Sequence, residues 1–277
     1  MLNTQLFNTQ LLNVWPYYEE EVFSGIAMYN DLSFDSDNIR ISRMSDLEDL
    51  NQFTWTTYKT ARVHGEWHTS FYYDRKTVVI EGIIKADSAS ELETLIKTMK
   101  QALFVEQQEL RINKSNGDQM WTTATCTWLK FDRQAYHISF VPFTVEFTTL
   151  SPFFFGTTLE TTEFLSKSAS FTEAVANLSG NYKSLPQVLI SFGTGLVWVT
   201  TVSVVIGDKT ITVTDTFVDS DAILIDCSAR DVYINSIGWA EFTGDFGELE
   251  IGETPIEVTI NWTRDADIYF LWYPTYV

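Results

Sequence analysis

The chain contains three histidines, and two of them lie in the segment His64-Gly-Glu-Trp-His68, which has the residue types of a zinc-protease motif. That motif requires adjacent His and Glu residues on a helix, where two imidazoles four residues apart reach one metal ion. Gly65 separates the first His from the Glu and disfavours a helix. As a strand, the segment would carry His64, Glu66 and His68 on one face, either as a surface metal triad or as the polar side of a half-buried strand. The second interpretation is favoured, so no metal site is predicted.

Closely spaced carboxylates occur in three pairs and in one longer acidic segment. The pairs are Asp35-Ser-Asp37, Asp219-Ser-Asp221 and Asp265-Ala-Asp267. None continues into a calcium loop with a central Gly and a terminal bidentate Glu, so each is interpreted as a turn. The segment from Gly244 to Glu253 either binds a cation or forms a solvated loop, and the loop is favoured. The sequence therefore predicts neither a metal nor a cofactor.

Aromatic residues in the second half are candidates for stacking on sugar rings, namely Trp198, Trp239, Trp262 and Trp272. Trp198 and Trp262 lie inside strongly apolar runs, so a position in the core is predicted for both. Trp239 follows Ile237-Gly238 and is expected in a loop, which makes it the candidate ligand-stacking residue. A carbohydrate-binding adhesin module is therefore kept as an alternative function.

Motifs typical of enzymes are missing from the sequence. It contains no G-x-S-x-G elbow, no Walker loop and no dinucleotide fingerprint. A Ser-His-Asp triad assembled from distant residues stays open, and so does a carboxylate pair for glycoside hydrolysis among the 37 acidic residues. Nothing singles out such residues, so no catalytic residue is predicted and a non-enzyme is expected, with a glycoside hydrolase as the weakest alternative.

Charge and composition exclude some partners. The 277 residues are 45% hydrophobic, 20% charged and 15% aromatic, which is typical of a globular protein rich in β structure. Lys and Arg number 18 against 37 Asp and Glu, a net charge of −19, whereas phosphate backbones require clustered cations. Residues 156–277 hold 5 basic and 17 acidic residues, so this half carries −12. No specific nucleic-acid binding is expected.

The cysteines and the N-terminal residues bear on the compartment. Cys126 and Cys227 lie one in each half without Cys or His at metal-ligand spacing, so both are predicted to be buried free thiols. Met1 to Trp15 has no basic region before its apolar residues, and no window reaches the length of a membrane span. We therefore expect no membrane insertion, and a protein made in a reducing cytosol.

These candidate residues must be positioned by a largely β framework, and the clearest part of it is Arg75 to Leu103. β-Branched residues predict a strand over 77–84, in which Gly82 indicates a bulge or a close backbone approach. Ser88 and Glu91 have the spacing of a capping box at the start of a helix. The helix would bury the apolar side chains at Leu92, Leu95, Ile96, Met99 and Leu103. Other strands of this half are predicted over 34–41, 58–69, 110–113, 120–131 and 135–149, with a hairpin at Asn116-Gly117.

The second half reads as short strands with polar turns, which favours an antiparallel β-sandwich or jelly roll. The strands are predicted over 187–192, 196–206, 210–214, 222–227, 231–234, 249–251, 255–262 and 268–273. Three adjacent Phe residues, 153–155, are expected to pack into a domain or subunit contact. The predicted organisation is a first domain of α+β class over 1–155, a Ser/Thr-rich linker over 156–185 and a β-sandwich over 186–277.

The order of these parts resembles the distal tail protein (Dit) family of long-tailed (siphovirus) bacteriophages. The strand, Gly82 and the amphipathic helix are similar to the ring-forming belt domain of that family. In the second half, Ala222 to Asn235 and then Gly247 to Gly252 are similar to its galectin-like C-terminal domain, in which a strand ending in Asp, a following Arg and Val, an Asn and a later Leu-x-x-Gly recur in order. Galectin-like describes the fold, and the sugar-holding residues of galectins are not recognisable here.

The resemblance implies a structural virion protein with a mainly β fold, one helix in an α+β ring-forming domain, and a galectin-like β-sandwich. It further implies a hexameric hub ring at the distal end of the tail, assembled in the bacterial host cytoplasm. The implied partners are other copies of the chain, the tail tube protein, the C-terminus of the tape-measure protein, the tail-tip (tail-associated) or baseplate protein, and receptor-binding proteins. The lumen of such a ring would pass DNA without specific contacts, and an acidic wall suits this role.

Overall fold

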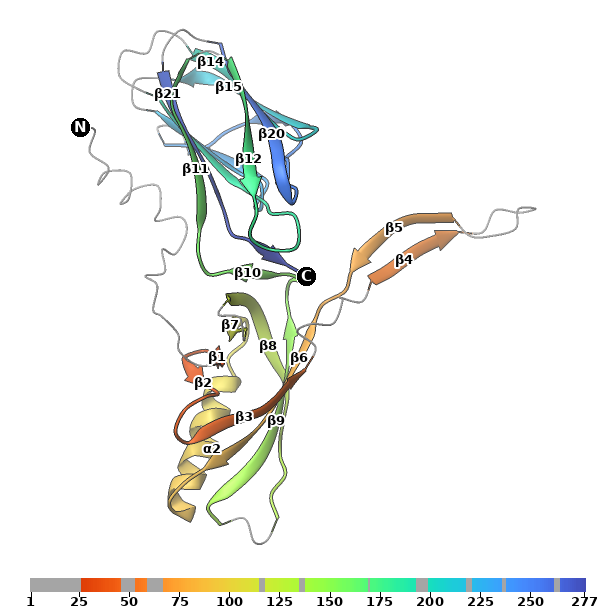
Figure 1. Cartoon of the computed structure of the whole chain (residues 1–277), viewed down its shortest axis with the longest axis vertical. Helices are drawn as coiled ribbons and strands as arrows, with labels where there is room; N and C mark the ends of the chain where they lie inside the picture. Colours follow the sequence, from red (N-terminus) through yellow and green to blue (C-terminus); the bar gives the residue numbers. More distant parts are fainter. Residues whose placement is uncertain are drawn as a thin grey trace. The chain divides into compact units, whose positions relative to one another are not determined.

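The computed structural model describes residues 26–45, 53–58, 67–114, 118–134, 138–168, 170–192, 199–217, 221–235, 238–261 and 265–277. Two compact units are distinguished, the first unit (Phe23–Gly156) and the second unit (Thr157–Tyr276) (Figure 1). Both are built mostly of antiparallel strands, and α2 (Ala89–Leu103) is the one helix of the described residues. The predicted mainly β fold with one helix is thereby confirmed.

One antiparallel sheet organises the first unit, with the strand order β2-β1-β7-β8-β9-β6-β3 and with β10 paired to β8. The strand predicted over 34–41 is confirmed only from Ile39, where β3 begins, because Ser36 accepts a hydrogen bond from the amide of Ile39 at 3.1 Å and the residues before it form a turn. The strands are β1 (Ala27–Tyr29), β2 (Leu32–Ser33), β3 (Ile39–Ser45), β6 (Thr77–Lys85), β7 (Gln108–Asn113), β8 (Gln119–Phe131), β9 (Phe140–Thr149) and β10 (Phe154–Gly156). The predicted hairpin at Asn116-Gly117 lies outside the described residues.

Helix α2 begins at the predicted cap. The Ser88 hydroxyl accepts a hydrogen bond from the amide of Glu91 at 3.2 Å, and the Glu91 carboxylate accepts one from the amide of Asp87 at 2.9 Å. The returning bond thus reaches one residue before the N-cap, where a standard capping box reaches the N-cap itself. The buried face consists of Leu92, Ile96, Met99 and Leu103, as the apolar spacing predicts, and Leu95 is half-buried.

Gly82 permits the close packing of three strands. A Cβ atom added there would lie 2.5 Å from the carbonyl oxygen of Arg40 on β3 and 2.6 Å from the Phe143 ring on β9. The pairing of β3 with β6 also shifts register between Ile41 and Arg43, directly beside Gly82. The predicted close backbone approach is therefore confirmed, and the irregularity lies on the neighbouring strand.

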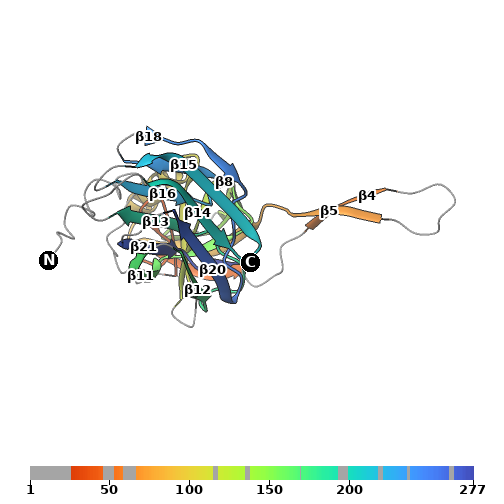
Figure 2. The same ribbon diagram turned by 90° about the horizontal axis from the view of Figure 1, so that it is seen from above.

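A separate two-stranded ribbon belongs to the first unit in sequence. It consists of β4 (Phe53–Tyr58) and β5 (Trp67–Tyr73), which pair with each other in an antiparallel manner (Figure 2). Within the described residues, neither strand joins the larger sheet. The predicted strand over 58–69 is correct in type but begins at Trp67, and residues 59–66 lie outside the described part of the chain.

The three consecutive Phe residues pack inside the first unit. Phe154 is buried, Phe153 makes an edge contact with Tyr73, and Phe155 packs on Trp121 with ring centroids 5.2 Å apart. The indole nitrogen of Trp121 also donates to the carbonyl of Gly156 at 3.2 Å. The aromatic run therefore fixes the end of this unit.

The second unit is a sandwich of two antiparallel sheets. Sheet one has the order β11-β21-β13-β16-β17-β18, and sheet two has the order β12-β20-β14-β15-β19. The strands of the two sheets are β11 (Glu160–Ser168), β12 (Ser170–Asn177), β13 (Gln187–Phe192), β14 (Val199–Ile206), β15 (Lys209–Phe217), β16 (Ala222–Asp226), β17 (Asp231–Ile234), β18 (Gly238–Trp239), β19 (Phe242–Gly244), β20 (Gly252–Ile260) and β21 (Asp265–Trp272). The short strand β22 (Thr275–Tyr276) belongs to neither sheet of the sandwich. The predicted strand over 249–251 is only a single bridge between Leu249 and Ser184.

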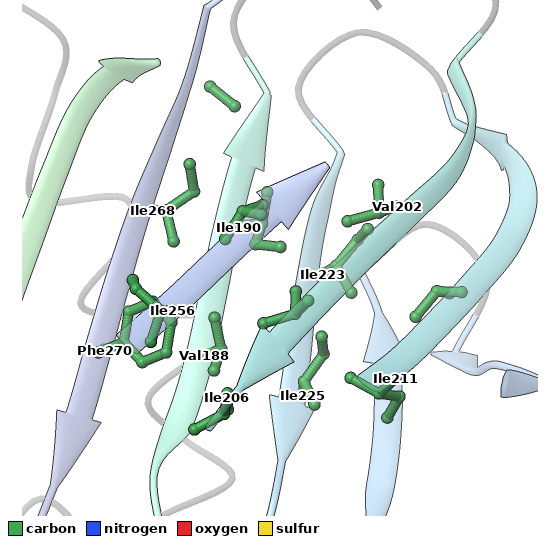
Figure 3. Close-up of a cluster of buried hydrophobic side chains, with 14 of the residues drawn as sticks. Val188, Ile190, Val202, Ile206, Ile211, Ile223, Ile225, Ile256, Ile268 and Phe270 are labelled. Atoms are coloured by element: carbon green, nitrogen blue, oxygen red, sulfur yellow. The ribbon is translucent and has the colours of Figure 1, made fainter. Parts of the chain in front are cut away.

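The core lies between the two sheets. Strands of sheet one bury alternate residues against alternate residues of sheet two, so aliphatic side chains interdigitate in one layer (Figure 3). The members labelled in Figure 3 are Val188, Ile190, Ile223, Ile225, Ile268 and Phe270 of sheet one and Val202, Ile206, Ile211 and Ile256 of sheet two. Because one side of each strand is buried, the side chains between these positions point outward.

The predicted linker over 156–185 is wrong. Its residues form β11, which pairs with β21, and β12, which pairs with β20, so both strands belong to the sandwich. Their exposed side chains are mostly Ser, Thr and Glu, because these strands lie at the edges of the two sheets. No helix among the described residues is long and apolar enough to cross a membrane.

Candidate functional site

Trp239 is a highly exposed aromatic side chain, with 68% of its surface accessible. It lies in the short edge strand β18, which pairs with β17 through Tyr233, so the predicted loop position is corrected to a strand. Gly238 precedes it with a φ of 96°, a backbone conformation that other residues rarely adopt. The Trp239 and Tyr233 rings meet edge to face with centroids 5.7 Å apart. Trp239 therefore presents an oriented aromatic surface at the border of sheet one.

The remaining tryptophan candidates do not extend this surface. Trp272 is buried, and its indole nitrogen donates to the side chain of Asn177 at 3.1 Å. Asn177 in turn donates to the carbonyl of Leu249 at 3.2 Å, within a buried polar cluster that also contains Ser184. Trp198 and Trp262 lie outside the described residues. Only Trp239 is thus placed by the structure as an exposed candidate.

The Asp that ends β16 builds a turn. One oxygen of Asp226 accepts hydrogen bonds from the amides of Ser228 at 2.8 Å and Ala229 at 2.9 Å, and the other accepts from the Gln187 amide group at 2.7 Å. Arg230, in the same turn, has a φ of 58°. These contacts close the hairpin between β16 and β17, so both carboxylate oxygens of Asp226 accept hydrogen bonds within the fold.

The later residues of the same sequence pattern are also structural. The Asn235 side chain accepts a hydrogen bond from the amide of Ala222 at 2.9 Å, and this bond ties the end of β17 to the start of β16. Leu249 is buried, and Gly252 begins β20 with a φ of 93°. The pattern Asp, Arg, Val, Asn and Leu-x-x-Gly therefore specifies hairpins and core packing, not a ligand site.

Some of the acidic candidates are engaged in local contacts. Asp267 accepts a hydrogen bond from the amide of Ser166 at 2.9 Å, and Asp221 is buried. Glu248, in the acidic segment 244–253, forms an ion pair with Lys183, and this hydrogen bond raises the pKa of that lysine. No group of three potential metal ligands occurs among the described residues. His64, Glu66 and Asp219 lie outside them.

The two thiols differ in their environments. Cys227 is buried, and loss of hydration raises its pKa to about 12. Cys126 is only half-buried, so the prediction that it is buried is corrected, although burial still raises its pKa. Both are free thiols. A raised pKa keeps a thiol protonated and unreactive at neutral pH, so neither residue has the character of a nucleophile.

Outward-facing residues of sheet one are the positions that motif analysis missed. Leu189, Leu224, Tyr233 and Tyr269 lie between buried positions of their strands and are half-buried. Alternation within each strand could identify them as outward-facing, but their alignment across the sheet depends on strand pairing over long sequence distances. Together with Trp239 they give this sheet a set of aligned non-polar side chains on its outer side.

Two family descriptions match the chain. Residues 31–149 match the phage tail protein RIFT-related domain, and residues 179–271 match the siphovirus-type tail component, C-terminal domain. No curated protein gives a significant match. The two matched segments lie one in each unit.

The fold is similar to that of the SPP1 Dit protein, whose crystal structure is described as a paradigm of the hub adsorption apparatus in phages that infect Gram-positive bacteria. The TM-score is 0.68 at 14% identity, over 91% of this chain and 99% of that chain. A chain of the phage P2 baseplate, in its activated conformation with calcium, gives a TM-score of 0.45 at 11% identity, over 88% of this chain and 96% of that chain.

Proposed function

Because this chain belongs to the distal tail protein family of siphoviruses, we propose that it is the hub of a phage tail. In this proposal, six copies form a ring at the distal end of the tail. The ring joins the tail tube to the tail-tip or baseplate proteins and to receptor-binding proteins. The role is architectural, and the protein has no catalytic activity of its own.

One observation carries the proposal. Both family matches occur in one chain and in the order RIFT-related domain, then C-terminal domain, and the similar fold extends over nearly all of both compared chains. A match to the sandwich alone would support many binding functions, because sandwiches occur in unrelated proteins. The combination of both units is what favours a hub.

The first unit has features that suit contacts with further copies. Within the described residues, β3 pairs only with β6, so a seven-residue strand lies at the edge of the sheet. Among the described residues, β4 and β5 pair only with each other. An isolated two-stranded ribbon is marginally stable in water, and an open edge invites pairing with another chain. Heterologous contacts through these elements would close into a ring if the rotation between copies fits.

The remaining partners follow from the position of the hub. The tail tube protein and the C-terminus of the tape-measure protein would meet one end of the ring, and the tail-tip protein the other. Assembly would take place in the cytoplasm of the bacterial host before incorporation into the virion tail. DNA would pass through the lumen without specific contacts, since the net charge of −19 does not favour phosphate binding.

The test is the mass of the full-length protein in solution by light scattering, followed by negative-stain imaging. We expect a hexameric mass and particles with a central hole. A variant in which Phe53–Tyr73 is replaced by a short Gly/Ser linker should lose the ring, whereas Lys97→Ala on the exposed face of α2 should keep it. A full-length protein that stays monomeric, both alone and after mixing with its tail tube protein, would contradict the proposal.

Carbohydrate binding is a second candidate function, favoured by the exposure of Trp239 and its edge contact with Tyr233. A sugar ring could stack on the free face of the indole. Glycan-array binding that disappears in Trp239→Ala would support this function. Equal signals for both proteins would remove it.

A further inference from the structure

Sheet one of the second unit carries a continuous row of large outward-facing side chains, here called the aromatic row. Strand pairing aligns Glu163, Tyr269, Leu189, Leu224, Tyr233 and Trp239 from β11 to β18, each residue opposite the next. The inward-facing neighbours of these residues fill the core, so the row lies on the outer surface of the sheet (Figure 3). The row therefore crosses the whole sheet at right angles to its strands.

The fold does not require such a row, as the opposite face of the sandwich demonstrates. Sheet two aligns Thr212, Ser203, Thr259 and Ser170 in the same manner. Their hydroxyl groups pair across the strands, at 2.8 Å between Ser203 and Thr212 and at 3.2 Å between Ser170 and Thr259. This row of one outer face is thus hydroxylated and the row of the other is aromatic and aliphatic, although both belong to the same sandwich. Exposed apolar surface of this kind is typical of a docking site.

Acidic side chains border the aromatic row. Glu163 ends the row itself, Asp226 and Asp231 face each other on one side of it, and Asp267 lies on the other side. No Lys or Arg occupies an outward position in the described strands of this sheet between these residues; the nearest cation in sequence is Arg230, in the turn after β16. The whole half of the chain carries 5 basic and 17 acidic residues. The electrostatic potential at the rim is therefore negative.

We propose that the aromatic row is the docking site for a partner protein whose contact surface has an apolar centre and Lys or Arg at its rim. This arrangement is complementary to the row and resembles the apolar core and polar rim of protein interfaces. The inference rests on the proposed hub function, because a hub must bind a further virion protein. A second copy of this chain would bring another acidic rim, and like charges disfavour that contact. A sugar is a less suitable ligand, because Leu189 and Leu224 at the centre of the row separate the aromatic rings on which it would stack.

The experiment is photo-crosslinking in intact tails. Tyr233→p-benzoylphenylalanine places the reactive group within the row, and Thr212→p-benzoylphenylalanine places it on the hydroxylated face as the matched control. Cross-linked peptides are identified by mass spectrometry. We expect the first variant to join a peptide of another virion protein that contains Lys or Arg, and the second to give a yield about tenfold lower, as expected where no apolar contact surface exists.

Charge reversal tests the acidic rim. Glu163→Lys combined with Asp231→Lys should lower the cross-linking yield at position 233 about tenfold, because both cations would face cations of the partner. Glu257→Lys, on the exposed face of sheet two, is the control with the same kind of change and should keep the yield. If the cross-linking yield of the rim variant equals that of the control, the proposed charge complementarity is wrong.

Three results would overturn the proposal while leaving the hub function intact. The first is equal cross-linking from both faces, and the second is cross-links confined to this chain. The third is binding of the protein to a glycan array through the row, with no cross-link to another protein. In each case the hexameric mass of the same variants shows whether the ring itself forms. Loss of the ring in all variants and in the unmodified protein would instead refute the hub function.

Discussion

Asn177 ties together three segments of the second unit, and its substitution by Ala gives a quantitative test of the fold. The side chain is 1% exposed. Its amide group donates to the carbonyl of Leu249 at 3.2 Å and to the Ser184 hydroxyl at 3.4 Å, while its carbonyl accepts from the Trp272 indole at 3.1 Å. Asn177→Ala removes all three interactions at once.

The expected cost is dominated by the indole. The Leu249 carbonyl retains a hydrogen bond from the amide of Ser184 at 2.9 Å, so the loss of the bond from Asn177 costs little at this group. The Trp272 N–H group is buried and would lose its acceptor on Asn177, which costs about 1–3 kcal/mol for an unsatisfied donor. With the small cavity added, we expect the free energy of opening of the second unit to fall by about 2–3 kcal/mol.

Hydrogen exchange measures this quantity within the unit concerned. Amides of β13 and β20 report the opening of the sandwich, and amides of α2 in the first unit serve as the internal control. In a Trp272→Phe background the donor is absent, so Asn177→Ala should cost about 1–2 kcal/mol less than in the natural sequence. Additive effects within about 0.5 kcal/mol would refute the reasoning, because they would mean that the two side chains are not coupled.

Three further predictions concern single residues. Gly82→Ala should destabilise the first unit by about 1–3 kcal/mol in thermal unfolding, since its Cβ would meet the Arg40 carbonyl at 2.5 Å; unchanged stability would show that β3 moves away freely. Ser88→Ala should cost about 1 kcal/mol by exchange at the start of α2, and Ser88→Asp should restore most of it. Burial raises the pKa of Cys227 from 9.0 to about 12, so the folded protein holds this proton more tightly than the unfolded chain. The associated stability is therefore present below pH 9 and is lost as the pH rises toward 12. In urea unfolding, the free energy of unfolding should fall by about 2 kcal/mol more between pH 9 and pH 11 than in Cys227→Ala, which lacks the thiol.

Local signals were sufficient where one short segment determines its own structure. The cap at Ser88, the apolar spacing of α2 and the role of Gly82 all follow from residues close together in sequence. Strands β13 and β17 were likewise predicted with their observed bounds, because their inward positions alternate strictly between buried and outward-facing residues.

The edge strands were missed for a physical reason. β12 buries only Val175 and Asn177 along its eight residues, and its remaining side chains are exposed except for Phe171, which is half-buried. Such a strand is held by backbone hydrogen bonds to β20, which sequence patterns do not reveal. The same limitation applies to Trp239, whose two-residue strand exists only because β17 pairs with it.

The residues that identify the family and the residues that select a partner are different sets. Asp226, Asn235 and Gly252 direct their side chains or backbones into turns and strand ends, so they specify the sandwich whatever binds to it. Leu224 and Tyr233 face outward and contribute little to the core, so they are free to change without loss of the fold. A family match therefore identifies the scaffold, whereas the partner is encoded in the outward row. If the proposed hub function is correct, exchanging that row between this chain and a related tail protein should exchange their partners and leave their oligomeric masses unchanged.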